Sequence, residues 1–535
     1  MLDVLITGGD VYDGSGGPPM RADVGIAGDR VAWIREAPPG QAEPGPAATV
    51  VIDAAGKAVC PGFINILSHS NRSILHDPRS LGELTQGVTT EVFGEGTSMG
   101  PLTPQYRASL ERDGLNYEVA WTRLSEYLSY VERRGSSQNV ASFLGGGTIR
   151  SSVVGYLDRP ATAAEMDQMR ALVAEEMADG AMGIASALIY PPGSYASTAE
   201  LTDLCRVAAR HDGCYASHIR SEGDDLHGAL AEFLAICRDA GVRGELFHLK
   251  AAGRDHWDKM DGAIDLIEQA RAAGEPVSAD VYPYPASSTG LTSIIPDRYH
   301  EGGADALFDR LADPAARAQI RADLNGSGRW GDVTEAGSVL ILQVTLEDNR
   351  KWQGRTLDDI AAERGVHPID AALDLIASDR SEVDCAFFSM SEDNLRKALR
   401  RPWVAISSDG TSMAPEGAFL QAPTHPRSYG SFARVLGYYA REEQVLSLAD
   451  AIRRMSALPA AALGLADRGL LREGNFADVV VFDPATVKDR ATFADPHQLS
   501  VGVSEVLVNG QVTVSGGEFA GRLAGRALAG PGRRR

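Results

Sequence analysis

The chain has 535 residues, enough for a barrel of about 250 residues or more together with a smaller second domain. Its 44% hydrophobic and 23% charged residues are typical of a globular protein with a large core. A net charge of −21 disfavours nucleic acid as a partner, because phosphate binding needs clustered Lys and Arg. Only the stretch from Arg526 to Arg535 is basic, and we expect Pro531 to Arg535 to be a frayed terminus.

The cysteines and the first residues of the chain indicate the cellular compartment in which we expect the protein. Five cysteines, an odd number with irregular spacing and no Cys-x-x-Cys pair, are typical of free thiols in a reducing environment. The N-terminus has neither the charged region nor the apolar region of a signal peptide, and no run of about 18 apolar residues occurs. We therefore expect a cytoplasmic protein without a membrane partner. The oligomeric state stays open.

Both ends of the chain read as short β-strands joined by tight turns. The apolar runs lie at residues 4–7, 24–27, 30–34, 50–53, 477–482 and 503–514. Turns are predicted at Gly8-Gly9-Asp10, Gly28-Asp29 and Asn509-Gly510, and a Pro/Gly/Ala loop at residues 40–48. Because neither end has enough strands for a stable sheet, we predict that residues 1–60 and 470–535 form one small β-sandwich domain. Residues 61–469 would then be a barrel inserted between them.

The middle of the chain alternates between β-like and helical patterns. Apolar runs lie at residues 62–68, 88–93, 140–145, 181–186, 213–218, 244–248, 277–281 and 403–409. Helical periodicity separates them, for example at residues 163–178, 200–212, 226–240 and 260–273. Eight strands alternating with helices predict a (β/α)₈ barrel of the α/β class. The last gap is too long for one helix, so residues 292–395 should hold an insertion, which we interpret as a lid over the barrel mouth.

Three chemically useful side chains stand at the ends of predicted strands. His218 and His248 end the fifth and sixth runs, and Asp409 ends the eighth. In a parallel barrel, all three would emerge at the C-terminal mouth, where such folds place their chemistry. Two imidazoles and a carboxylate suit a zinc site with a nearby proton carrier. A third ligand is needed, and the candidates are Glu95, His69 and Asp409; for Glu95 the alternative is that it caps the segment that follows it.

Other motifs favour structural roles. The segment Ser221-Glu222-Gly223-Asp224-Asp225 is acidic but lacks the spacing of a calcium loop, so we interpret it as a solvated loop. Gly94-Glu95-Gly96 lacks the helix and the acidic residue of a dinucleotide-binding fingerprint. No Gly-x-Ser-x-Gly elbow surrounds Ser287-Ser288-Thr289, which disfavours a serine nucleophile.

Ordered segments along most of the chain carry a family resemblance. They are Pro61-Gly62-Phe63-Ile64-Asn65, Gln86-Gly87-Val88-Thr89-Thr90, Ala216-Ser217-His218-Ile219-Arg220, His248-Leu249-Lys250, Asp280-Val281-Tyr282-Pro283-Tyr284, Ser408-Asp409-Gly410, residues 425–437 and residues 474–482. In these segments the chain resembles the amidohydrolase superfamily, specifically its D-aminoacylase branch, the N-acyl-D-amino-acid deacylases. The resemblance implies a zinc-dependent enzyme that cleaves the amide bond of an N-acyl-D-amino acid or a related amide.

The resemblance also implies roles for individual residues. His218 and His248 are similar to the family's zinc ligands, and Asp409 to its general acid/base. The family supplies a further ligand after strand two, often a cysteine; here only Glu95 can replace it. The carboxylate of the substrate is held in the family by residues that look like Tyr190, Lys250, Tyr282 and Arg427. An arginine fork beside a lysine suits a carboxylate.

The chain departs from the family pattern at the first strand. The superfamily motif His-x-His is incomplete, because Leu67 replaces the first histidine and Asn65 replaces the preceding aspartate. His69 remains, either as a further ligand or as a pocket-lining residue. Gly145-Gly146-Gly147 has no histidine in its middle, and residues 183–189 offer no lysine that could bridge two metals. We therefore predict one zinc ion per chain, held by Glu95, His218 and His248.

Two alternatives remain beside the leading hypothesis. The same scaffold could hydrolyse or mature peptides or cyclic amides, or run a condensation in reverse, because the altered first strand reshapes the pocket. The incomplete His-x-His motif could also mark a catalytically inactive homologue that only binds a ligand. The acyl group, the D-side chain and the certainty of one metal over two are left open by the sequence.

Overall fold

A closed barrel of parallel strands forms the centre of the computed structural model, which describes residues 1–36, 47–112, 117–326 and 336–534. The described strands occupy eight positions, since the third strand is broken into two pieces around Phe143. In barrel order they are β6 (Phe63–Asn65), β7 (Val88–Phe93), β8 (Asn139–Ser142) with β9 (Leu144–Gly145), β10 (Gly183–Ala187), β11 (Cys214–His218), β12 (Arg243–Leu246), β13 (Val277–Val281) and β17 (Val404–Ile406). The ring closes where Ser68 bridges to Gly410 and the amide of His69 donates to the Gly410 carbonyl at 2.9 Å.

The predicted barrel strands are confirmed in position and direction. Each is buried on both faces, which is why the sequence reads as continuous apolar runs rather than as alternation. The inward side chains form one cluster, to which Ile64, Val92, Ala216 and Phe247 belong. The outward side chains pack against helices. These are α3 (Pro104–Arg112), α4 (Leu124–Arg134), α5 (Gly146–Val153), α6 (Ala163–Asp179), α7 (Thr198–Ala209), α8 (Leu226–Ala240), α9 (Met260–Ala272), α15 (Glu392–Leu399), α16 (Arg427–Arg434), α17 (Leu448–Met455) and α18 (Ala457–Leu463), with the short helices α1 (Ser73–His76) and α2 (Leu81–Leu84) near the mouth.

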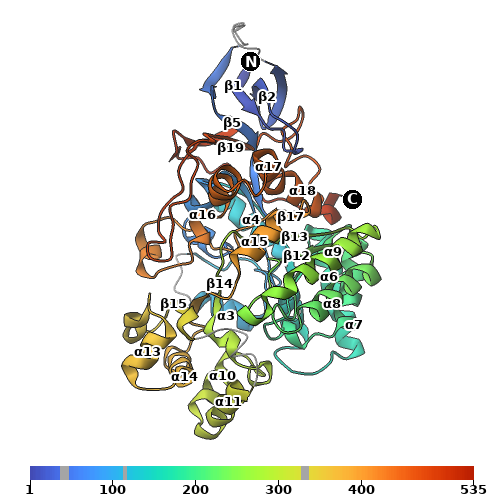
Figure 1. Ribbon diagram of the computed structural model, residues 1–535. Helices are drawn as coiled ribbons and strands as arrows, with labels where there is room; N and C mark the ends of the chain where they lie inside the picture. Colours follow the sequence, from blue (N-terminus) through green and yellow to red (C-terminus); the bar gives the residue numbers. More distant parts are fainter. Residues whose placement is uncertain (37–46, 113–116, 327–335, 535) are drawn as a thin grey trace.

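Strands from both chain ends pair in one sheet. Within the described residues this sheet has nine strands: β1 (Leu2–Val11), β2 (Met20–Ala27), β3 (Arg30–Glu36), β4 (Ala48–Asp53), β5 (Ala58–Pro61), β18 (Val479–Phe482), β19 (Val503–Val508), β20 (Gln511–Ser515) and β21 (Glu518–Phe519). The two ends join where β5 runs antiparallel to β18. Val4 and Val24 from the first end share a core with Val481 and Leu507 from the second. Figure 1 places β1 and β2 at one end of the molecule, beyond β5 and β19.

Two local predictions are wrong for reasons of long-range structure. The turn expected at Gly8–Asp10 is a bulge inside β1, where the pairing with β2 shifts register between Ile6 and Gly9. The tail predicted to fray from Pro531 instead forms a 3₁₀ turn over Pro531–Arg534 that packs against α6, next to the bond of 2.8 Å from the Gly530 amide to the Gly180 carbonyl, and Arg535 lies outside the described residues. Most of the loop predicted at residues 40–48 lies outside the described residues.

Among the described helices, none combines the length and apolar character needed to cross a bilayer.

The insertion between β13 and β17 has a core of its own. It contains β14 (Ser287–Gly290), α10 (Ala304–Ala312), α11 (Pro314–Gly326), β15 (Val339–Gln343), α13 (Leu357–Arg364), α14 (Pro368–Asp379) and β16 (Asp384–Phe387). The three strands form an antiparallel sheet whose buried face includes Ile341, Cys385 and Phe387. In Figure 1 its helices lie at the end of the molecule opposite β1 and β2. Its role as a lid stays a prediction.

Candidate functional site

Two histidines meet over one carboxylate at the C-terminal mouth of the barrel. His218 is the last residue of β11, and His248 follows β12 by two residues, so neighbouring strands carry them to the same level. Their rings lie edge to face with centroids 4.4 Å apart. Nδ1 of His218 and Nε2 of His248 both approach Oε1 of Glu95, at 2.9 Å and 3.3 Å. Three residues far apart in the chain thus converge on one point.

Glu95 reaches this point because glycines flank it. Gly94 has φ +110° and a side chain there would meet the Phe143 carbonyl oxygen at 2.4 Å. Gly96 has φ +61°, and a Cβ would lie 2.6 Å from Cβ of Ala187. Only glycine tolerates this close, left-handed path. The turn after β7 therefore presses against the neighbouring strands and leaves the Glu95 side chain only 6% exposed.

A second group of donors shares the other oxygen of Glu95. Nε2 of His69 lies 3.1 Å from Oε2 of Glu95 and 3.0 Å from Oδ1 of Asp409. The His69 side chain is 41% exposed, whereas those of His218 and His248 are 8% and 2% exposed. In each group, Glu95–His218–His248 and His69–Glu95–Asp409, the donor atoms lie within 4.8 Å of one another. Nitrogen and oxygen donors suit Zn²⁺, and the better enclosed first group fits one ion.

Two residues of the site have backbone conformations that L-residues seldom adopt. His248 has φ +38° and Asp409 has φ +49°. Such conformations cost on the order of 1–3 kcal/mol each and persist where the surroundings hold them. The amide of His248 donates to Oδ1 of Asp280 at 3.1 Å, and the amide of Asp409 donates to the Leu67 carbonyl at 2.9 Å. These bonds turn both side chains towards the mouth.

The four predicted substrate-binding residues all lie at this mouth. Nζ of Lys250 and the guanidinium carbon of Arg427 lie 5.8 Å and 4.9 Å from the ring centre of Tyr282. Arg427 also donates to Asp409 Oδ2 at 2.6 Å. The Tyr190 ring packs edge-on to His218 with centroids 5.7 Å apart. The structure therefore brings two cations and two tyrosines around the candidate metal ligands.

The insertion contributes polar groups to the same mouth through β14. The Arg427 guanidinium donates to the Ser288 carbonyl at 3.2 Å, and the Tyr190 hydroxyl lies 2.5 Å from Oγ1 of Thr289. Both contacts tie a predicted substrate-binding side chain to the first strand of the insertion. They link the position of the inserted sheet to the shape of the pocket.

Glu222 is the residue that sequence reasoning missed. We interpreted its segment as a solvated loop, and for Glu222 this is wrong, because its side chain is only 13% exposed. Its Oε1 lies 3.0 Å from Nδ1 of His248 and 2.5 Å from Nζ of Lys250. The signal available in the sequence was spacing, because Glu222 follows His218 by four residues, in the loop that the chain forms directly after β11.

The charge balance of the site keeps its carboxylates ionised. Burial raises the pKa of Glu95, but hydrogen bonds from His218, His248 and His69 outweigh this and hold it well below its usual value. Burial likewise acts against ionisation of Asp409, and Arg427 together with His69 lowers its pKa to about 2. At neutral pH both are therefore in the forms needed for a ligand and for a proton acceptor.

The histidines make the stability of the metal-free protein dependent on pH. Burial and the Lys250 charge lower the pKa of His248, but Glu222 and Glu95 raise it overall to about 10. Because this folded pKa lies above the unfolded value near 6.5, the stabilisation is complete below about pH 6.5 and is lost as pH rises towards 10. We expect the Tm of chelator-treated wild type to fall over this range more than that of His248→Gln. Equal slopes for the two proteins would contradict this.

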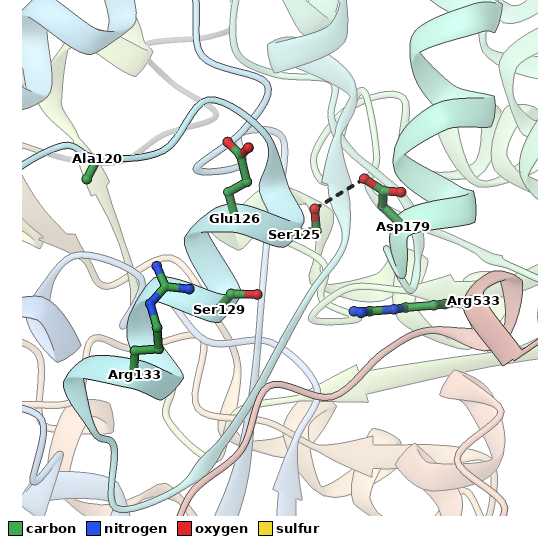
Figure 2. Close-up of a pocket in the computed structure, with 7 residues that line it drawn as sticks. All are labelled: Ala120, Ser125, Glu126, Ser129, Arg133, Asp179 and Arg533. Atoms are coloured by element: carbon green, nitrogen blue, oxygen red, sulfur yellow. Dashed lines mark hydrogen bonds between the residues drawn. The ribbon is translucent and has the colours of Figure 1, made fainter.

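A separate hollow opens on the outer surface of the barrel. It has a volume of about 440 Å³ and lies between α4, the end of α6 and the C-terminal segment (Figure 2). Its lining residues are Ala120, Ser125, Glu126, Ser129, Arg133, Asp179 and Arg533. The Ser125 hydroxyl donates to Asp179 across it at 3.2 Å. This lining holds neither histidine nor cysteine, so we place the chemistry at the barrel mouth.

Comparison with known proteins gives the lineage of this site. Residues 50–514 match the model of the amidohydrolase family. The chain belongs to the amidohydrolase family. It is 35% identical to the D-aminoacylase of Alcaligenes xylosoxydans xylosoxydans, over 99% of this chain and 98% of that protein. The predicted resemblance to this superfamily and to its D-aminoacylase branch is confirmed.

Solved structures of other family members share the whole architecture. The crystal structure of N-acyl-D-glutamate deacylase from Bordetella bronchiseptica, complexed with zinc and a phosphonate inhibitor, has a TM-score of 0.80 and 32% identity, covering 99% of both chains. A D-aminoacylase structure, described by its binuclear metal centre with one-metal activation and second-metal attenuation, has a TM-score of 0.81 and 33% identity. It covers 99% of this chain and 100% of its own. The predicted (β/α)₈ fold class is thereby confirmed.

Proposed function

We propose that this amidohydrolase cleaves the amide bond of N-acyl-D-amino acids, using one Zn²⁺ held by Glu95, His218 and His248. The observation that carries the proposal is the shared Glu95 oxygen, which lies 2.9 Å and 3.3 Å from ring nitrogens on adjacent strands. The similarity to D-aminoacylase and to a zinc-containing N-acyl-D-glutamate deacylase supports both the substrate class and the ion.

The donor set fits a catalytic zinc site. Such sites use three protein ligands of the imidazole and carboxylate types and leave a position open. An ion held there supplies a Lewis acid that polarises the amide carbonyl and makes water more acidic. The low pKa of Glu95 agrees with this role, because the carboxylate stays ionised without a proton of its own.

Asp409 would carry the proton of the reaction. Its Oδ1 points to His69 and its Oδ2 to Arg427, so the carboxylate is held at the edge of the ligand cluster in its ionised form. It would accept a proton from the attacking water and deliver it to the nitrogen of the leaving amine. A substrate carboxylate on Arg427 would share the guanidinium and weaken its hold on Asp409, which raises the pKa of Asp409 and makes it a stronger base.

A cationic clamp would orient the substrate. Lys250 and Arg427 stand beside the same ring of Tyr282, and a carboxylate between them would be bound by an ammonium and by a planar fork. Tyr190 would add a hydroxyl donor from the other side. Fixing the carboxylate places the amide carbonyl at a set position relative to the ligand cluster, and a third contact, between the pocket wall and the substrate side chain, would then select the hand at the α-carbon.

The sequence of the first strand, β6, and of the residues after it favours a site with one metal ion over a site with two. Leu67 cannot ligate a metal, so the second donor group lacks half of the His-x-His pair and depends on the exposed His69. For the similar D-aminoacylase, one metal is described as activating and a second as attenuating. A single occupied position would therefore suffice here.

Elemental analysis together with an amine-release assay tests the proposal. We expect about one zinc per chain and hydrolysis of N-acyl-D-amino acids in preference to their L-enantiomers, assayed with neutral and acidic side chains. Turnover of cyclic amides or peptides in place of these substrates would favour the alternative chemistry on the same scaffold. A protein with neither zinc nor turnover would be an inactive homologue.

A further inference from the structure

Glu222 stands behind both histidines of the candidate zinc site. Nδ1 of His218 and Nε2 of His248 face Glu95, so their other nitrogens face the opposite way. On that side, Oε1 of Glu222 lies 3.0 Å from Nδ1 of His248, and Oε2 lies 3.6 Å from Nε2 of His218. In the described part of the chain, Nε2 of His218 is buried and makes no hydrogen bond, so the Glu222 carboxylate at 3.6 Å is an ion-pair partner and not a hydrogen-bond acceptor in this geometry.

The chemistry of imidazole decides what His248 needs on this side. A neutral ring that binds a metal through Nε2 carries its proton on Nδ1, and that proton requires an acceptor. Nζ of Lys250 lies 2.7 Å from Nδ1, but an ammonium group can only donate. The Glu222 carboxylate can accept, and it lies close enough to both groups. It can therefore accept a hydrogen bond from Nδ1–H of His248 and pair with Lys250 at the same time.

Lys250 and Glu222 favour different tautomers of the neutral His248 ring, because both approach its Nδ1. If the ammonium donates to Nδ1, the ring proton must sit on Nε2, where it faces Glu95 and blocks ligation. Glu222 draws the ammonium to its Oε1 at 2.5 Å and offers the same oxygen to Nδ1. With the Lys250 side chain only 3% exposed, no bulk water competes for this charge.

We propose that Glu222 is a positioning residue that fixes the metal-binding tautomer of His248, supports the ring of His218 from behind and prevents Lys250 from capturing Nδ1. The inference rests on the proposed function and goes beyond its ligand set. Carboxylates behind metal-binding histidines orient the ring and raise its basicity, and their loss weakens metal affinity by about 10–100-fold.

Zinc affinity, measured by competition with a chromophoric chelator, tests this role in the full-length protein. We expect Glu222→Ala to bind zinc about a hundredfold more weakly than wild type, and Glu222→Gln about tenfold more weakly, because the amide oxygen still accepts a hydrogen bond. Asp225→Asn is the matched control, since it removes an exposed charge from the same loop at the N-terminus of α8. We expect wild-type affinity for it.

The double variant Glu222→Ala/Lys250→Met separates the tautomer effect from general damage. It removes the ammonium that would otherwise capture Nδ1 and that would be left buried without a partner. We expect it to bind zinc about tenfold more tightly than Glu222→Ala, yet about tenfold more weakly than wild type. Thermal unfolding in chelator identifies any variant that fails to fold. If Glu222→Ala fails to fold, the zinc affinity of the double variant relative to wild type decides the result.

The outcomes distinguish this inference from the proposed function. Wild type that binds zinc and releases amines, together with folded Glu222 variants of wild-type zinc affinity, would overturn the role of Glu222 alone. A double variant no better than Glu222→Ala would overturn the part assigned to Lys250. Wild type without zinc affinity would overturn both proposals.

Discussion

The Asp409→Asn variant is expected to lose turnover by about a hundredfold or more while its zinc affinity stays near that of wild type. The amide has the shape of the carboxylate but cannot take a proton from water. Its amide oxygen can still accept a hydrogen bond from Arg427, which donates to Oδ2 of Asp409 at 2.6 Å, whereas the amide nitrogen replaces the oxygen that lies 3.0 Å from Nε2 of His69. Steady-state kinetics on an N-acyl-D-amino acid, with zinc content measured in parallel, checks this result.

The outcome for zinc tells which donor group is used. Asp393→Asn, which changes a side chain 88% exposed on α15, is the matched control and should behave as wild type. If Asp409→Asn kept its turnover, Asp409 would not be the acid/base. If it lost zinc together with turnover, Asp409 would act as a ligand in the group that contains His69.

The barrel could be predicted because the patterns of its strands and helices are visible in short, local stretches of sequence. Strands buried on both faces, such as β11 and β13, are continuous apolar runs, and amphipathic helices such as α8 separate them. The joining of the chain ends followed from strand count alone. The bulge at Gly8 and the docked tail at Gly530 could not be predicted, because they depend on register and on contacts with distant residues.

The candidate site divides in the same way. His218 ends β11, and His248 and Asp409 follow the ends of β12 and β17 by two and three residues, so parallel topology alone places them at one mouth. The role of Glu222 depends on the path of the polar loop that carries it. The composition of that loop is the same whether the loop is solvated or places Glu222 beside Lys250, so the sequence does not distinguish the two cases. The ion pair between Arg427 and Asp409 joins α16 to the end of β17 and likewise has no local signature.

The His248→Ala variant is expected to lose both stoichiometric zinc and at least about a thousandfold in turnover. Among the described residues its Nε2 is one of two imidazole nitrogens that face Glu95 Oε1, and a ring 2% exposed leaves a space that the Ala methyl group does not fill. Losing the ion removes several kcal/mol of transition-state stabilisation, at about 1.4 kcal/mol for each tenfold in rate. His227→Ala, on the exposed surface of α8, is the control.

The zinc content of His69→Ala, compared with that of His248→Ala, tells how many zinc ions each chain binds. Under the one-ion proposal, His69→Ala keeps one zinc per chain, because the group formed by Glu95, His218 and His248 stays complete. Its turnover falls less than that of His248→Ala, through the lost contact with Asp409 at 3.0 Å. Wild type with two zinc ions, reduced to one in His69→Ala, would establish a binuclear site despite Leu67. Zinc retained at wild-type level in His248→Ala would remove His248 from the ligand set.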